Sequence, residues 1–184
     1  MTNFILKTVL LYLLLNLPTV SFSDESTKPS LVTKQYKDWT LRCVKIKTKE
    51  DCEITQTLQV NNSNLQFTIA YTNFINEENE LKQIINIITP LGVNLQKRIS
   101  LNFHKGTKLN LPYTKCEVVG CITSVTNNSK DLVVVNVFEQ IKKAMINSIF
   151  FEITVNGFNR NPIKVKSSLQ GFENALKELN SSKN

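Results

Sequence analysis

Hydrophobic and polar residues alternate along most of the chain from Tyr36 onward, with the period of two that is typical of half-buried β-strands. In residues 65–74, "LQFTIAYTNF", every second side chain from Leu65 to Tyr71 is hydrophobic or aromatic. "RISLNF" and "TKLNL" alternate in the same way around "HKG", which predicts a hairpin. "LKQIINIIT", "CITSV", "IFFEITV" and "PIKVK" are further strand candidates. The pattern predicts about nine short strands.

Two segments have helical spacing instead. In "KDLVVVNVFEQIKKAMI" the apolar residues recur every three or four positions, with Lys142 and Lys143 opposite them. Ser168 to Leu179 shows a clearer apolar face, and Ser167 or Ser168 is expected to cap that helix. Together these elements predict a mainly β fold, an antiparallel β-sandwich of immunoglobulin-like architecture with one or two short helices. A closed β-barrel is the alternative.

The N-terminus has the layout of a secretory signal. Lys7 precedes an apolar run from Val9 to Leu17, which Pro18 ends, and small residues follow at Ser21 and Ser23. The run is too short to span a bilayer, which needs about 20 apolar residues. We therefore expect a signal peptide at 1–23, a flexible polar lead-in at 24–35 and a single β-sandwich domain at 36–184. The mature chain is expected to be exported, with no transmembrane segment.

The four cysteines form two local pairs, "CVKIKTKEDC" from Cys43 to Cys52 and "KCEVVGC" with Cys116 and Cys121. An even number of cysteines in an exported chain favours disulfides. Neither pair has the C-x2-C spacing of zinc sites or of thioredoxin-like centres. Three connectivities are possible. The local one is favoured because each pair flanks a hairpin turn, with Gly120 able to take a positive φ in the second.

No constellation of catalytic residues stands out, so we predict no catalytic, metal or cofactor site. The single histidine, His104, lies at a hairpin tip beside Lys105. No G-x-S-x-G motif and no glycine-rich phosphate loop occurs in the sequence, which has five glycines in all.

Charge is the remaining feature. Net charge is +7, and the segment from Leu81 to Cys116 holds six cations and no acid. Lys97, Arg98, Lys105 and Lys108 lie on the outward phase or the tip of the predicted hairpin, so we expect them to form one face that attracts an anionic ligand. Nucleic acid is not expected, because the chain is exported and three of its 22 basic residues are arginine.

The chain resembles the invasion-associated locus B (IalB) family of exported bacterial proteins. The resemblance rests on "YKDWTLRC", on Cys52, on "TPLGVNL", on the Cys116 and Cys121 pair and on "SLQGFENALKEL". It implies a β-sandwich in the periplasm or at the outer envelope and a link to host-cell invasion, and it brings no catalytic residues. We therefore predict a non-enzymatic envelope protein that binds a protein or an anionic envelope or host-surface component. A periplasmic enzyme or enzyme accessory, hydrolytic or thiol-linked, is the alternative.

Overall fold

The computed structural model describes residues 29–46, 49–61, 63–76, 78, 80–157 and 161–181, which form eleven strands and two helices. The predicted signal peptide lies outside the described residues. The strands are β1 (Ser30–Tyr36), β2 (Trp39–Ile46), β3 (Lys49–Gln59), β4 (Gln66–Ile75), β5 (Leu81–Thr89), β6 (Ile99–Phe103), β7 (Lys108–Leu111), β8 (Lys115–Glu117), β9 (Gly120–Thr126), β10 (Phe150–Val155) and β11 (Ile163–Ser168). The helices are α2 (Leu132–Asn147) and α3 (Phe172–Ser181).

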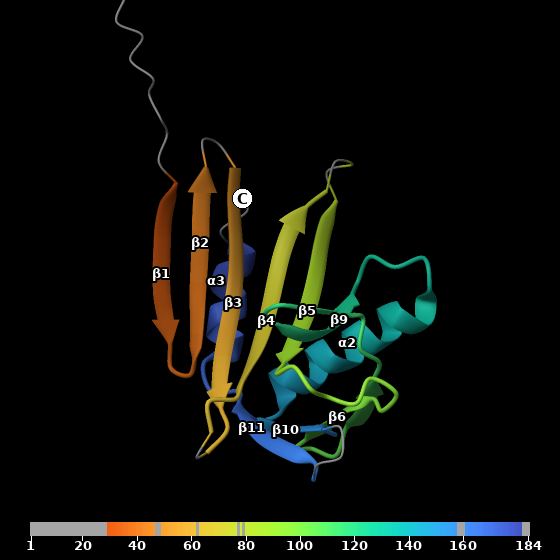
Figure 1. Ribbon diagram of the computed structural model, residues 1–184. Coiled ribbons are helices and arrows are strands. Elements are labelled where there is room, and N and C mark those ends of the chain that lie inside the picture. The colour runs from red at the N-terminus through yellow and green to blue at the C-terminus, as the bar shows by residue number, and fades with distance from the viewer. Residues whose placement is uncertain are drawn as a thin grey trace, which may run out of the picture.

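Seven strands form a large antiparallel sheet in the order β1-β2-β3-β4-β5-β9-β8. The alternation seen in the sequence decides which side chains share its inner face. In β4, Phe67, Ile69 and Tyr71 all point inward and are fully buried. Figure 1 shows β1 to β5 side by side, with the helix α3 behind β2 and β3.

The remaining four strands form a small antiparallel sheet in the order β11-β10-β6-β7, at the lower end of the molecule in Figure 1. Its inner face also follows the alternation, since Phe151, Ile153 and Val155 of β10 are buried and the residues between them are not. The mainly β fold of two antiparallel sheets is confirmed. Within the described residues neither sheet closes on itself, so the alternative of a closed barrel is wrong.

The two helices complete the core. Asp131 caps α2, its carboxylate accepting a hydrogen bond from the backbone N–H of Val133 at 2.8 Å. Four α2 side chains are buried: Phe138, Ile141, Ala144 and Met145. The β-prone valines that precede them are exposed or half-buried, so the helix is stabilised mainly by the burial of these four later residues. With sixteen residues, α2 is longer than the short helix predicted.

The cap predicted for the second helix is wrong. Ser167 belongs to β11, where it is fully buried and donates a hydrogen bond to the side-chain oxygen of Gln56 at 2.6 Å. The helix begins four residues after Ser168, at Phe172, whose ring packs edge-on against Trp39 with 4.9 Å between centroids. The strand β11 therefore ends at Ser168, the residue at which the helical spacing began, and residues 169–171 connect it to the helix.

Part of the predicted flexible lead-in is also wrong. Ser30 to Gln35 belong to β1, which pairs with β2 from Ser30 opposite Lys45 to Tyr36 opposite Trp39. Their side chains are exposed and polar for the most part, so the pattern that marks a half-buried strand is missing. The backbone pairing with β2 makes this segment a strand nonetheless.

Two disulfides join Cys43 to Cys52 and Cys116 to Cys121, which is the local connectivity. Their Cα atoms lie 4.1 and 3.9 Å apart, at directly opposed positions of two antiparallel strand pairs. Three of the cysteines are buried, as expected for inward strand positions, but Cys116 is exposed. In the described part of the chain, no helix is both apolar enough and long enough to cross a membrane.

Candidate anion-binding surface

The outer face of the small sheet is polar and is formed by alternate residues of four strands. Because side chains alternate across a strand, the residues between the buried positions all point to this side. They are Ser100, Asn102, Lys108, Asn110, Phe150, Glu152, Thr154, Lys164, Lys166 and Ser168. Arg98 precedes β6 in the same phase, and its Nη1 donates to the backbone oxygen of Asn110 at 3.5 Å.

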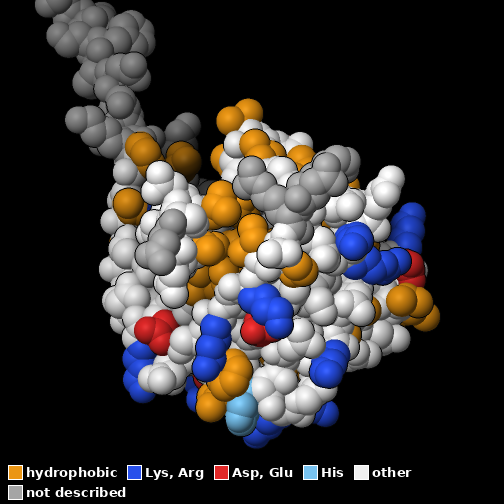
Figure 2. All heavy atoms as spheres, turned by 60° about the horizontal axis from the view of Figure 1, so that its bottom comes forward, with side chains coloured by type: hydrophobic (Ala, Val, Ile, Leu, Met, Phe, Trp, Pro, Cys, Tyr) orange, Lys and Arg blue, Asp and Glu red, His pale blue; other side chains and the backbone are white. Residues whose placement is uncertain are grey.

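Cations dominate this surface. We define the basic face as Arg98, Lys108, Lys164 and Lys166, which come from both outer strands of the small sheet and from the start of β6. Among the described residues of the face, Glu152 is the single acid, and its carboxylate lies 3.4 Å from the Lys164 amine. Figure 2 shows this end of the molecule, with Lys and Arg side chains spread over it and fewer Asp and Glu among them.

An aromatic group lies within the same surface. The Lys166 amine is 3.7 Å from the ring centroid of Phe150, which is close enough for a cation–π contact. The imidazole of His104, in the turn directly after β6, has its centroid 5.0 Å from that of Phe150. His104 is therefore an exposed residue beside an aromatic ring.

The four predicted residues do not form one continuous face. Arg98 and Lys108 lie on the basic face, and exposed Lys97 lies in the turn before β6, where its N–H donates to the backbone oxygen of Asn94. Lys105 lies at the β6–β7 turn and lines a pocket against α2. The structure adds Lys164 and Lys166, which the outward phase of "PIKVK" would have indicated.

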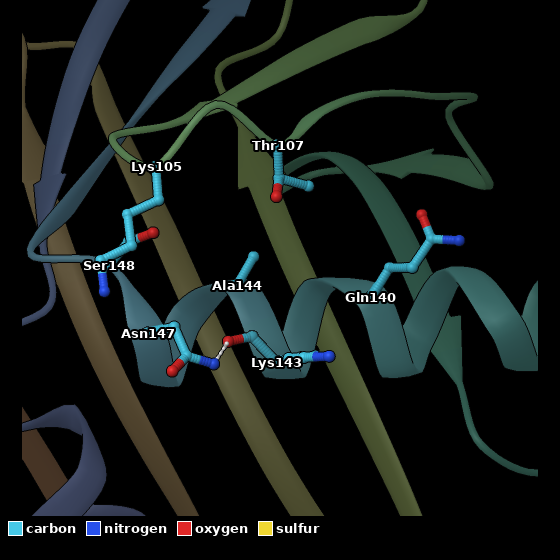
Figure 3. A pocket seen from close by; sticks show the side chains of 7 residues that line it. All are labelled: Lys105, Thr107, Gln140, Lys143, Ala144, Asn147 and Ser148. Atoms are coloured by element: carbon cyan, nitrogen blue, oxygen red, sulfur yellow. Dashed lines mark hydrogen bonds between the residues drawn. The ribbon is translucent and has the colours of Figure 1, made fainter.

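The pocket beside Lys105 has a volume of about 500 Å³ and is lined mainly by polar side chains. The hairpin supplies Lys105 and Thr107, and the end of α2 supplies Gln140, Lys143, Ala144, Asn147 and the adjoining Ser148. Figure 3 shows the two groups on opposite sides of the pocket. Asn147 Nδ2 donates to the Lys143 carbonyl at 2.8 Å, and the buried Ser148 hydroxyl has no hydrogen-bond partner among the described residues. The lining carries two cations and no acid.

Groups with perturbed acidity lie elsewhere. Burial raises the pKa of the Tyr71 phenol far above its usual value, and burial also raises the pKa of Tyr113. Neither residue lines the pocket or belongs to the basic face. Glu50 lies beside the Cys43–Cys52 disulfide, but oxidised sulfurs are not the thiolates that bind metals. The arrangement therefore offers hydrogen-bond donors and positive charge rather than a nucleophile and a base.

These features define a class: a two-sheet, disulfide-bonded β protein whose smaller sheet presents a basic outer face. Residues 39–180 match the sequence model of the family described as invasion associated locus B (IalB) protein, and the chain belongs to that family.

The fold is similar to that of a solved structure, the crystal structure of invasion associated protein B from Bartonella henselae. The two share 21% sequence identity with a TM-score of 0.58, over 82% of this chain and 95% of the other. A comparison with curated protein sequences found no match.

Proposed function

We propose that this chain is an exported, non-enzymatic protein that binds an anionic component of the bacterial envelope or of a host surface through the basic face. Its family consists of invasion-associated proteins, and its two disulfides are consistent with export. The observation that carries the proposal is the gathering of Arg98, Lys108, Lys164 and Lys166 on one sheet face with Glu152 as their acidic neighbour.

The chemistry of the face favours a polyanion. Exposed lysines attract phosphate, sulfate and carboxylate groups, but each contact is weak because salt screens exposed charges over about 8 Å. Several cations must therefore act together, and affinity must fall as ionic strength rises. An exported protein meets such polyanions as lipopolysaccharide cores, anionic lipid headgroups and acidic glycans.

The alternative of a periplasmic enzyme has less support. Within the described residues, His104 is exposed and its ring lies beside Phe150. Every cysteine of the described chain is in a disulfide, so thiol chemistry would first need a reductant. The tyrosines whose pKa burial raises, Tyr71 and Tyr113, are poor acids at neutral pH.

Charge reversal on the basic face tests the binding proposal. We expect Lys108→Glu combined with Lys166→Glu to lower the salt concentration at which the mature protein elutes from heparin, a sulfated polysaccharide. The matched control is Lys45→Glu with Lys130→Glu, which changes net charge equally at exposed positions outside the face. If both double variants elute at the same salt, the protein is retained by its net charge and the basic face is not a binding site.

Export is tested separately. Cleavage after Ser23 predicts that the mature protein begins at Asp24 and occurs in the periplasm, at the outer envelope or in the medium. Fractionation of native cells followed by N-terminal sequencing measures both properties. Recovery of the chain from the cytoplasm with residues 1–23 still attached would contradict the export proposal.

A further inference from the structure

The pocket between the β6–β7 turn and the end of α2 contains a buried hydroxyl that the fold leaves unpaired. Ser148 is 8% exposed, and its Oγ has no hydrogen-bond partner among the described residues. A buried polar group without a partner costs about 1–3 kcal/mol. Because Ser148 lines the pocket and its hydroxyl can rotate about one bond, a ligand placed there can supply the missing partner. Binding in this pocket therefore satisfies a group that folding does not.

Two lysine amines of the same pocket also lack a protein partner. Lys105 comes from the β6–β7 turn and Lys143 from the last turns of α2. Within the described residues neither amine forms an ion pair or a hydrogen bond, and no acid lines the pocket. Two positive charges that share one pocket repel each other, and an anion placed with them offsets that repulsion. The pocket therefore favours a ligand with a negatively charged group.

The end of α2 opposes this preference only weakly. A helix C-terminus carries roughly half a negative elementary charge, whereas each lysine carries a full positive one. The Lys143 carbonyl also accepts a hydrogen bond from Asn147 Nδ2 at 2.8 Å, and the Ala144 carbonyl accepts one from the N–H of Ser148 at 3.0 Å. Two carbonyl groups of the lining residues are thus already hydrogen-bonded. Positive charge therefore dominates the lining.

The remaining lining suits hydroxyl groups. Thr107, Gln140 and Asn147 supply one hydroxyl and two amides, which both donate and accept hydrogen bonds. Figure 3 shows the Thr107 and Gln140 side chains directed into the space between the hairpin and the helix. Among the described lining residues Ala144 is the single apolar one, so a largely apolar ligand would leave polar atoms unpaired. A ligand with several hydroxyl groups avoids that cost.

The walls of the pocket are joined before any ligand binds. The N–H of His104 donates to the carbonyl of Phe150 at 3.1 Å, and Phe103 pairs with Phe151 in the β6–β10 ladder. These contacts tie the β6–β7 turn to the segment that directly follows Ser148. The volume of about 500 Å³ lies within the range of sites for small organic molecules, about 300–1,000 Å³. A small ligand therefore meets a backbone that is already in place, which lowers the entropy cost of binding.

We propose that this pocket binds an anionic sugar, a monosaccharide unit that carries a carboxylate or a phosphate group. The amines of Lys105 and Lys143 bind the anionic group, and the Ser148 hydroxyl donates to one of its oxygens. The side-chain amides of Gln140 and Asn147 hydrogen-bond the sugar hydroxyls. The site is separate from the basic face, because none of the four cations of that face lines the pocket.

Calorimetric titration of the mature protein with four probes tests this assignment. The probes are glucose 6-phosphate, glucuronate, glucose and inorganic phosphate. We expect at least one of the two anionic sugars to bind about tenfold or more tightly than glucose and than inorganic phosphate, because one added hydrogen bond to a charged group is worth about that much. Comparison of glucose 6-phosphate with glucuronate shows which anionic group the pocket prefers. In NMR spectra, the side-chain amide signals of Gln140 and Asn147 should shift during the titration.

Variants of the lining locate the binding. Ser148→Ala is expected to weaken it about tenfold without loss of stability, because the hydroxyl has no partner among the described residues. Lys105→Gln with Lys143→Gln is expected to weaken it at least as much. The matched control is Lys45→Gln with Lys130→Gln, which removes the same charge at exposed positions outside the pocket. This control is expected to bind like the parent.

The charge-reversal variant of the basic face, Lys108→Glu with Lys166→Glu, keeps the two sites apart. It is expected to elute earlier from heparin and to bind the anionic sugar like the parent. Unchanged heparin elution with intact sugar binding would contradict the proposed function alone.

Four results would overturn the assignment of an anionic sugar to the pocket. The first is that neither anionic sugar shows saturable binding, and the second is that both bind no more tightly than glucose or inorganic phosphate. The third is equal affinity of the pocket variants and their matched control. The fourth is loss of sugar binding in the basic-face variant, which would place the sugar on that face instead.

Discussion

Replacing Gly171 with alanine is expected to destabilise the fold by about 2–5 kcal/mol, because the glycine lies in tight contact just before α3. Its φ is +89°, in the left-handed region. A Cβ added there would lie 2.0 Å from the carbonyl oxygen of Tyr36 and 2.7 Å from its carbonyl carbon. The neighbouring backbone is fixed as well, since the N–H of Asp38 donates to the carbonyl of Gln170 at 3.4 Å.

The magnitude has two parts. Left-handed backbone costs a non-glycine residue about 1–2 kcal/mol. Overpacking against atoms that cannot move aside costs about 1–3 kcal/mol more. Relief of the clash requires α3 to move away from the β1–β2 turn, which would disturb the contact between Phe172 and Trp39. For a domain of this size, each kcal/mol lowers the melting temperature by about 2–4 °C.

Gly106→Ala separates these two parts. Gly106 has nearly the same φ, +93°, but an added Cβ there would meet no atom within 4 Å. This variant is therefore expected to lose about 1–2 kcal/mol, the backbone cost alone. Urea unfolding, followed by Trp39 fluorescence and by circular dichroism, measures both free energies. Equal destabilisation by the two variants, within about 1 kcal/mol, would refute the steric reasoning.

Three further predictions concern the disulfides and the buried tyrosines. Changing both Cys43 and Cys52 to alanine is expected to lower the free energy of unfolding in urea by at least about 2–3 kcal/mol, because the disulfide closes a loop with sequence separation 9 and so limits the entropy of the unfolded chain. An unchanged free energy of unfolding would show that the bond adds nothing to stability. Tyr71→Phe is expected to leave stability unchanged or raise it by about 1 kcal/mol, because the buried hydroxyl has no hydrogen-bond partner among the described residues; a clear loss by the same measurement would reveal a partner. Folding raises the pKa of Tyr71 and of Tyr113, so the folded state favours their neutral phenols. This preference contributes fully to stability below about pH 10, the usual pKa of tyrosine, and is lost as the pH rises through the folded pKa values. Absorbance titration should therefore find tyrosines that ionise late or together with unfolding, and early ionisation of every tyrosine in the folded protein would contradict this.

The sequence by itself determined most of the strands and the outward phase of individual side chains. Alternation is a local property, because a half-buried strand needs apolar groups on one side and polar groups on the other. It therefore indicated β4, the β6–β7 hairpin and the strand β10 from neighbouring residues alone. The short separation of the cysteines favoured the local pairing for the same reason.

The same reasoning failed where a neighbour far along the chain decides the outcome. Residues 30–35 lack apolar alternation, and they form β1 because the backbone of β2 lies beside them. Ser167 and Ser168, predicted to cap the last helix, belong to the strand β11 instead, and Ser167 hydrogen-bonds Gln56, 111 residues away. In both cases backbone or side-chain pairing outweighs the local pattern.

Tertiary structure likewise determined which cations share one surface. Lys164 and Lys166 join Arg98 and Lys108 because β10 pairs with β6 on one side and with β11 on the other. Lys105 points to a pocket against α2 rather than to that face. Strand order depends on which long-range pairings bury the inner faces together, and no local period carries that information. The sequence therefore determined which residues point outward, and the sheet order determined which of them meet.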